Sequence, residues 1–304
     1  MDREENCVLS SFKTKRGRLG WSVFAVAVAG YCVLKIHSPA YETIAGGRGV
    51  GYGGDGGPAV RAGLDNPGAL ILDAQGNLYI ADTNNGVVRK VDILGRISTV
   101  AHDEAFQYAP RTPSEPEHNL FGPAGLAMDS AGDLYLSDGN YHVVYRVNRT
   151  GKATRIAGTG RSGYNGDGRQ ATTAQLNDPR DIALDGKGNL FILDRGNFRV
   201  RKVDANGRIT TVAGNGHTVP LDVEHYHPIN PDRKPSAPLE PSCLAVSADG
   251  ILYISDALGG IWKLDAAGHM QLMVGDGYPT IGAMALGGRT FSTLLLFRKG
   301  KYFE

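Results

Sequence analysis

Short apolar segments recur along residues 41–275, each five or six residues long and bounded by turn residues. Each unit continues with a segment of the LYIAD type, one of the VVRKV type and one such as RISTVA (96–101). Segments of this length with alternating or continuous apolar residues are typical of strands and too short for helices. The pattern therefore predicts four units of four strands, which open with ALILD (69–73), GLAMD (125–129), DIALD (181–185) and CLAVS (243–247).

Turns of one chemistry join these strands. DAQG, DSAG, DGKG and SADG follow the first strands, and DILG, NRTG, DANG and DAAG follow the third strands. An Asp, Asn or Ser caps such a turn, and the closing glycine takes the left-handed conformation of a bulged hairpin. Because tight hairpins join antiparallel neighbours, each unit is predicted to be a four-stranded antiparallel sheet.

The units repeat with a period near 56 residues. A shift of 112 aligns IAGGRGVGYGGDGGPA, from Ile44, with IAGTGRSGYNGDGRQA, from Ile156. Four-stranded sheets repeated at such a period around an axis form a β-propeller. The all-β propeller is expected over residues 41–304, with repeats near 47–101, 102–157, 158–213 and 214–275.

The ends of this region predict how the ring closes. YETIAG (41–46) matches the fourth strand of a unit, yet no first three strands precede it, and the tail 276–304 has no fourth strand. Donating residues 41–46 to this degenerate last blade gives a ring of five blades. Without this closure both sheet edges would be left unpaired, which favours aggregation. A truncated relative of a six-bladed ring is the alternative, because the turns of the tail are degraded.

The recurring motifs GDGGPA, GNLYIADTN and VRKVDILGRISTVA resemble those of the NHL-repeat family over residues 41 to about 275. The resemblance implies a β-propeller whose default role is interaction with other molecules. Similar propellers in sugar-lactone hydrolases hold calcium, and a zinc-dependent amidating lyase has a related shape. This sequence does not reproduce the histidine arrangement of that lyase.

The glycine-rich stretch GVGYGGDGGPA (49–59) contains the Gly49-x-Gly51-x-x-Gly54 spacing of a dinucleotide-binding turn. That chemistry needs a following helix, whose amino terminus faces the pyrophosphate. No helical pattern follows, so the stretch is interpreted as a connector between units. Asp55 and Asp167 recur at one repeat position and are expected to organise this turn.

A different pattern precedes the repeats. Residues 1–18 form a short basic segment, and an apolar run extends from Leu19 to Leu34. We expect one hydrophobic helix over 19–36, either a transmembrane anchor with its start in the cytosol or the h-region of a signal cleaved after Ala40. Both alternatives place the propeller outside the cytosol: periplasmic or extracellular when membrane-anchored through this helix, and secreted when the leader is cleaved.

The net charge bears on the class of binding partner, and the positions of the cysteines bear on the role of Cys243. The whole chain has 32 Lys and Arg against 31 Asp and Glu, a net charge of +1. Residues 1–40 contain six Lys or Arg and three Asp or Glu, a net charge of +3, so residues 41–304 carry a net charge of −2. Nucleic-acid binding needs a basic face, so no nucleic-acid partner is predicted. With Cys7 and Cys32 in the leader, Cys243 is expected to be a small buried hydrophobic residue.

Antiparallel order places all the D-x-x-G hairpins on one face and the connectors 47–66, 102–122, 159–178 and 215–240 on the other. Variable loops on a rigid scaffold usually carry recognition residues. The predicted function is a non-catalytic scaffold that binds a protein, peptide or glycan through the connector face. Aromatic and arginine side chains are enriched in contact patches, so the candidates are Tyr108, Arg111, Tyr141, Arg195, Phe198 and Tyr226.

The alternative is a metal-dependent lyase or hydrolase with zinc or calcium at the channel mouth. His225 and His227 are two residues apart and point the same way on an extended segment; with His217 they would supply three zinc ligands. A ring of strand-ending aspartates would suit calcium, but their recurrence in every unit favours a turn-capping role. No cofactor is predicted on this balance, and the four aspartates are Asp82, Asp138, Asp194 and Asp256.

Overall fold

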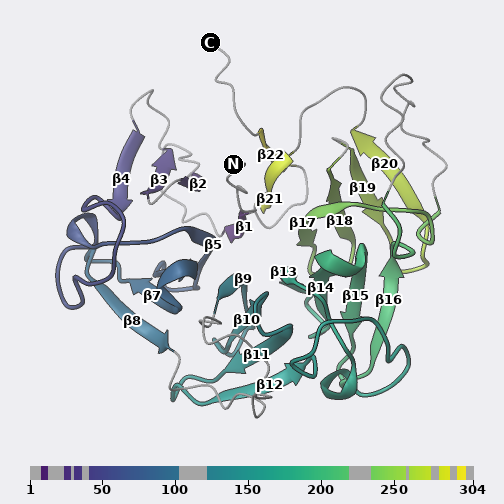
Figure 1. The fold of residues 1–304 in the computed structure, drawn as a ribbon. Helices are drawn as coiled ribbons and strands as arrows, with labels where there is room; N and C mark the ends of the chain where they lie inside the picture. Colours follow the sequence, from purple (N-terminus) through teal and green to yellow (C-terminus); the bar gives the residue numbers. More distant parts are fainter. Residues whose placement is uncertain are drawn as a thin grey trace.

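The computed structural model describes residues 8–12, 24–28, 31–35, 41–102, 122–218, 234–257, 260–274, 281–287 and 293–298. These residues form six β-sheets, and their helical content is confined to 3-10 turns such as η1 (Ala59–Arg61). The sheets stand around a common axis (Figure 1). The prediction of an all-β chain is confirmed.

Four sheets have the predicted four antiparallel strands, in consecutive order from the axis outward. Their strands are β5 (Pro67–Leu72), β6 (Leu78–Asp82), β7 (Val87–Val91) and β8 (Ile97–His102); β9 (Pro123–Met128), β10 (Leu134–Asp138), β11 (Val143–Val147) and β12 (Ala153–Ala157); β13 (Pro179–Leu184), β14 (Leu190–Asp194), β15 (Arg199–Val203) and β16 (Ile209–Ala213); β17 (Pro241–Val246), β18 (Leu252–Asp256), β19 (Ile261–Leu264) and β20 (Met270–Val274).

The core lies between neighbouring blades. The innermost strands β5, β9, β13 and β17 contact one another in that order. One cluster packs Ile71 and Ala81 of the β5–β8 blade against Leu126 and Leu136 of the β9–β12 blade. Burying apolar surface between sheets is the main term that holds the ring together, at roughly 25 cal/mol per Å².

The hairpins form as their turn chemistry predicts. Asp73 Oδ1 accepts hydrogen bonds from the backbone N–H groups of Gln75 (2.9 Å) and Asn77 (2.8 Å). The closing glycine has a positive φ, 90° at Gly76 and 76° at Gly95, which only glycine adopts without strain. The predicted capped hairpins are therefore confirmed.

The predicted closure of the ring is wrong. β4 (Tyr41–Ala45) pairs with β3 (Tyr31–Lys35), which pairs with β2 (Phe24–Val28). The last sheet consists of β21 (Ile281–Gly287), β22 (Thr293–Arg298) and β1 (Val8–Phe12), the last parallel to β21. Residues 41–45 are therefore hydrogen-bonded to the leader and not to the tail.

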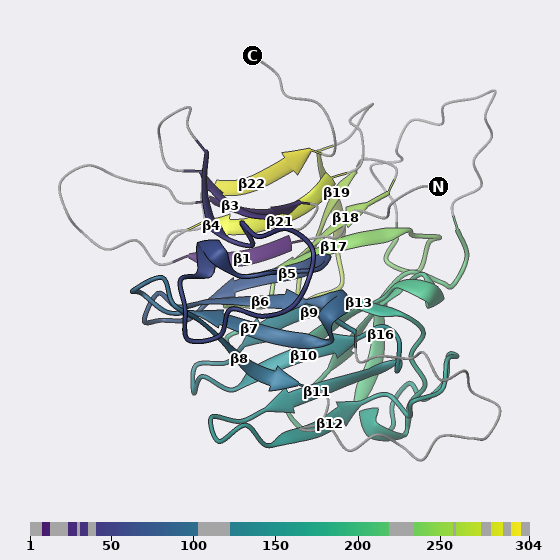
Figure 2. The ribbon, with the colours of Figure 1, turned by 60° about the vertical axis from the view of Figure 1, so that its left-hand side comes forward.

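Two three-stranded sheets complete the ring instead. β21 contacts β17, and both β1 and β2 contact β5. Figure 2 shows β1, β3, β4, β21 and β22 gathered above β5. This arrangement of six sheets corresponds to the truncated six-bladed alternative and differs from the five-bladed prediction.

The expected hydrophobic helix over 19–36 is also wrong where the structure describes the leader. Residues 24–28 and 31–35 are paired strands, with Phe24 opposite Lys35. The run contains Phe24, Val26, Val28 and Val33, and aromatic and β-branched residues favour strands. Among the described residues, no helix is both long and apolar enough to cross a bilayer.

Cys243 departs from its expected role. It is buried in β17, as predicted, but it is disulfide-bonded and is not a free thiol. The same repeat position holds Ala69 in β5 and Gly125 in β9, so a small side chain fits there.

Changing Cys243→Ala is expected to lower the free energy of unfolding by about 2–4 kcal/mol, because a disulfide restricts the unfolded chain. Urea denaturation with and without a reductant measures this. The reductant should destabilise the natural protein and leave the variant unchanged. Equal curves for the natural protein under both conditions would contradict the expectation.

Candidate binding surface

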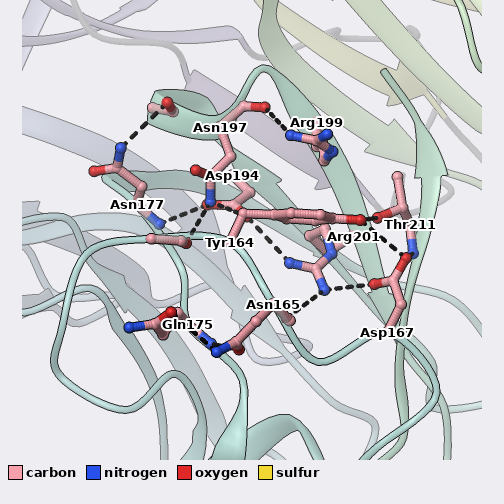
Figure 3. A network of polar contacts seen from close by, with 12 residues as sticks. Tyr164, Asn165, Asp167, Gln175, Asn177, Asp194, Asn197, Arg199, Arg201 and Thr211 are labelled. Carbon is pink, nitrogen blue, oxygen red and sulfur yellow. Dashed lines mark hydrogen bonds and ion pairs between the residues drawn. The ribbon is translucent and has the colours of Figure 1, made fainter. Parts of the chain in front are cut away.

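A buried arginine fastens the connector 159–178 to the blade that follows it. Arg201 lies in β15 with a fully buried side chain; its Nη2 is 2.6 Å from Asp167 Oδ1 and its Nη1 is 3.3 Å from Asp194 Oδ2. The ring of Tyr164 lies 4.8 Å from this guanidinium and 3.8 Å from that of Arg199. Figure 3 shows the ring between the two arginines.

The two carboxylates also bind the backbone. Asp167 Oδ2 accepts from the Thr211 N–H (3.2 Å), and Asp194 Oδ1 accepts from the Asn177 N–H (2.7 Å). Burial raises the pKa of Asp167, but Arg201 and Thr211 outweigh it and leave the pKa below its usual range. Burial raises the pKa of the more enclosed Asp194. The connector is thus held at its middle, through Asp167, and at its end, through Asn177.

The same network recurs 112 residues earlier. Arg89 is also fully buried, with Nη2 2.6 Å from Asp55 Oδ1 and Nη1 3.4 Å from Asp82 Oδ2. Tyr52 again stacks near the arginine, at 5.1 Å, and bonds to Thr99. The prediction that Asp55 and Asp167 organise the connector turn is confirmed.

The other two blades replace the arginine by an aromatic residue, Tyr145 in β11 and Trp262 in β19, both buried. Their connectors contain residues 103–121 and 219–233, which lie outside the described residues. Arginine and aromatic residues thus alternate at this position around the four blades, and both arginines pair with an aspartate of the preceding connector, Asp55 or Asp167.

The strand-ending aspartates bind the turns or connectors beside them. All four are buried, and Asp138 Oδ1 accepts from the N–H groups of Asn140 (2.9 Å) and Tyr141 (3.0 Å). Asp82 and Asp194 instead accept from a backbone N–H of the preceding connector, that of Asp65 and of Asn177, and from the side chain of the asparagine three residues later. The capping prediction is therefore confirmed at Asp138 and wrong at Asp82 and Asp194, whose side chains do not cap their own turns.

The zinc hypothesis falls largely outside the described residues, because His225 and His227 are not among them. His217 is described; it is exposed, and its N–H donates to Asn215 Oδ1 (3.0 Å). Within the part of the chain that the structure describes, no group of three or more His, Cys, Asp or Glu side chains is placed to hold a metal.

Three of the six predicted binding residues are described: Tyr141, Arg195 and Phe198. Tyr141 is half-buried and packs against the core between two blades. Arg195 and Phe198 lie in and beside η5 (Arg195–Asn197), the loop between β14 and β15. Tyr108, Arg111 and Tyr226 lie outside the described residues.

Arg195 belongs to a cluster at the junction of two blades that the sequence did not predict. Asp178 Oδ2 is 3.3 Å from Arg195 Nη1, and its Oδ1 is 2.8 Å from Arg180 Nε. The Asp178 N–H donates to His142 Nδ1 (3.1 Å), from the loop after β10. We term His142, Asp178, Arg180 and Arg195 the Arg195 cluster.

The cluster is polar and partly open to solvent. The Arg195 side chain is 44% exposed. Burial lowers the pKa of His142 despite the opposing effect of Asp178, so the ring is neutral at pH 7. Because Nδ1 accepts a hydrogen bond, the proton of the neutral ring lies on Nε2. The cluster therefore offers two guanidinium groups, one carboxylate and one imidazole donor.

Backbone strain marks the same loops. Gly86, His142 and Phe198 occupy one repeat position before the third strand, all with positive φ: 65°, 55° and 50°. Bulky residues are uncommon in this conformation, and such strain is concentrated at functional sites. The replacement of Gly86 by His142 and Phe198 in later repeats was the available sequence signal for this surface.

The chain contains an NHL-repeat β-propeller, as its four-stranded antiparallel sheets and its recurring GDGGPA, GNLYIADTN and VRKVDILGRISTVA motifs indicate. Residues 126–234 match the family model described as the teneurin NHL domain. The chain is 32% identical to human teneurin-1 over 240 residues, which is 72% of this chain and 8% of that protein.

Solved structures share the fold. A virginiamycin B lyase from Staphylococcus aureus aligns with a TM-score of 0.53 at 13% identity, over 89% of this chain and 71% of that one. A gluconolactonase from Xanthomonas campestris aligns with a TM-score of 0.53 at 12% identity, over 85% of this chain and 73% of that one. The chain spans only 5–13% of the length of the curated relatives it matches.

Proposed function

We propose that this protein is a non-catalytic interaction scaffold that binds a protein, peptide or glycan through its connector face. The similarity to the teneurin NHL domain supports a protein-interaction role. The Arg195 cluster carries the proposal, because it presents exposed arginine beside strained, bulky loop residues on a rigid sheet framework.

We also propose that the propeller works outside the cytosol. The disulfide of Cys243 supports this location, since disulfides persist mainly in oxidising compartments. Labelling of intact cells with a membrane-impermeant amine reagent tests this location. A propeller that is labelled only after the cells are lysed would contradict it.

Photo-crosslinking tests the connector face. A photoreactive amino acid at position 198 is expected to form a covalent adduct with the bound partner in intact cells. The matched control places the same group at Lys187, in a hairpin of the opposite face. Arg195→Ala should reduce the adduct from position 198 about tenfold, as expected for a contact residue at an interface. Adducts from 187 alone would contradict the proposal.

A metal-dependent lyase or hydrolase is the second candidate, favoured by the lyase and gluconolactonase among the solved structures of this fold. Elemental analysis of the purified protein separates the two. Stoichiometric zinc or calcium that is lost in a His225→Ala/His227→Ala variant would favour the enzyme and overturn the scaffold.

A further inference from the structure

Exposed aliphatic and arginine side chains gather at one outer corner of the β5–β8 blade. Ile93 and Leu94, at the tip of the β7–β8 hairpin, are 72% and 75% exposed. We term this set the Ile93 corner; its members are Arg48, Val60, Arg61, Ile93, Leu94 and Arg96, all exposed.

Backbone contacts bring the three segments of the corner together. The Ala59 N–H donates to Gly95 O (2.8 Å), and Pro58 forms a β-bridge with Arg96. The Arg48 N–H donates to Ala62 O (3.3 Å). The connector that carries Val60 therefore runs directly beside the hairpin tip, so the prediction that connectors and hairpins lie on opposite faces is wrong for this part of the connector.

The fold does not require these aliphatic residues. Of the eight hairpins with this turn chemistry, only DILG (92–95) has two large aliphatic residues at its tip. The copy of the corner 112 residues later has the same backbone contacts, including Ala171 N–H to Gly207 O (2.8 Å). At the positions of the three aliphatic residues it has Thr172, Ala205 and Asn206.

The charge around these residues is positive. Arg48, Arg61 and Arg96 are exposed at the corner. Of the nearby acids, Asp55 is paired with Arg89, and Asp92 caps the hairpin through the N–H groups of Leu94 and Arg96. Asp73, in the adjacent hairpin whose Gly76 lies beside Ile93, caps that turn through the N–H groups of Gln75 and Asn77. A cationic corner on a domain of net charge −2 favours an anionic partner.

We propose that the Ile93 corner docks the propeller on an anionic phospholipid surface, with Ile93 and Leu94 inserted at the level of the headgroups. Aliphatic side chains flanked by arginines bind such interfaces through combined burial and attraction to anionic lipids. The aliphatic side chains project from a convex hairpin tip, which suits a deformable lipid interface. The inference concerns a surface distinct from the Arg195 cluster and is independent of its function.

Vesicles of phosphatidylcholine with added phosphatidylserine test the proposal on the full chain. An environment-sensitive fluorescent amino acid at position 93 should shift to the blue with these vesicles, and less with pure phosphatidylcholine. The same residue at position 205, at the tip of the copy, is the matched control and should not shift. Raised salt should weaken the response at 93 because it screens the arginines.

A tip exchange provides the second arm. Ile93→Ala with Leu94→Asn installs the residues of the copy, so the turn is expected to form. This variant should bind the anionic vesicles about tenfold more weakly. Ala205→Ile with Asn206→Leu should create a second insertion site, detected as a gain in affinity.

Two outcomes overturn the proposal. One is equal vesicle affinity for the natural protein and the Ile93→Ala/Leu94→Asn variant. The other is an absent shift at position 93 together with a concentration-dependent dimer that this variant abolishes, which would identify the corner as a contact between two copies of the chain.

Discussion

Arg201→Met is expected to lower the free energy of unfolding by about 3–5 kcal/mol, because removing one partner leaves a buried charge uncompensated. Asp194 is fully buried, and its Oδ2 lies 3.3 Å from the arginine. The variant also releases Asp167, which holds the connector at Thr211. Urea denaturation at neutral pH measures the change.

Two matched variants separate the ion pairs from general packing. Lys202→Met changes the next residue of β15, a half-buried lysine whose ammonium lies 5.9 Å from the Phe191 ring, and should cost less than about 1 kcal/mol. In an Asp194→Asn background, Arg201→Met should cost less, since no buried carboxylate is left unpaired. Equal losses for Arg201→Met and Lys202→Met would refute the role of the network.

Because the network occurs twice in the chain, the equivalent substitution in the other copy should lower the free energy of unfolding by a similar amount. Arg89→Met removes the same contacts from the β5–β8 blade, at nearly the same distances. The two arginines lie in different blades and share no partners, so the losses should add within a few tenths of a kcal/mol. A strongly non-additive pair would indicate coupling through the ring.

The parts of the fold that the sequence predicted correctly depend on local chemistry. Each hairpin is specified by an Asp, Asn or Ser and a glycine three residues later, as at Asp73 and Gly76. The 112-residue repeat likewise fixed the roles of Asp55 and Asp167, because identical surroundings at both copies require one explanation.

The closure could not be predicted because strand pairing at the seam is non-local. YETIA has the pattern of an outer strand, but its sequence does not specify whether the leader or the tail pairs with it. The leader was interpreted as a helix from the length of its apolar run. That interpretation gave the length of the run more weight than the strand preference of β-branched residues such as Val26 and Val33. Periodicity could not correct it, because a short apolar run reads the same in a buried strand and in a helix.

The sequence identified only some members of the proposed binding surface. Arg195 and Phe198 were recognised from residue type, whereas His142, Asp178 and Arg180 were missed. Their association depends on two blades meeting, since Asp178 precedes β13 while His142 follows β10. A comparison of repeat positions would have found His142 and Phe198, because both stand where the first blade has Gly86.

Asp181 gives the second large effect, on the pH dependence of stability. It lies on the innermost strand β13, fully buried, where the other blades have Ala69, Gly125 or Cys243. Its Oδ2 accepts from the Leu244 N–H in the next blade (2.8 Å), and its Oδ1 from the Ile182 N–H (2.9 Å). Burial outweighs these two bonds and raises the pKa of the carboxyl group to about 7.

A raised carboxyl pKa makes the folded state bind more protons than the unfolded state between about pH 4 and pH 7. The contribution of Asp181 to the free energy of unfolding is therefore greatest in acid and falls as the pH rises through this window, by up to about 4 kcal/mol for a pKa shift of roughly three units.

Asp181→Ala should remove this dependence of stability on pH, and Ala69 shows that the fold accepts alanine there. Urea denaturation at several pH values measures both proteins, and subtraction isolates Asp181 from Asp82 and Asp194, whose pKa values burial also raises. Parallel profiles for the natural protein and the variant would show that Asp181 remains ionised in the fold, stabilised by the two backbone donors that bridge the blades.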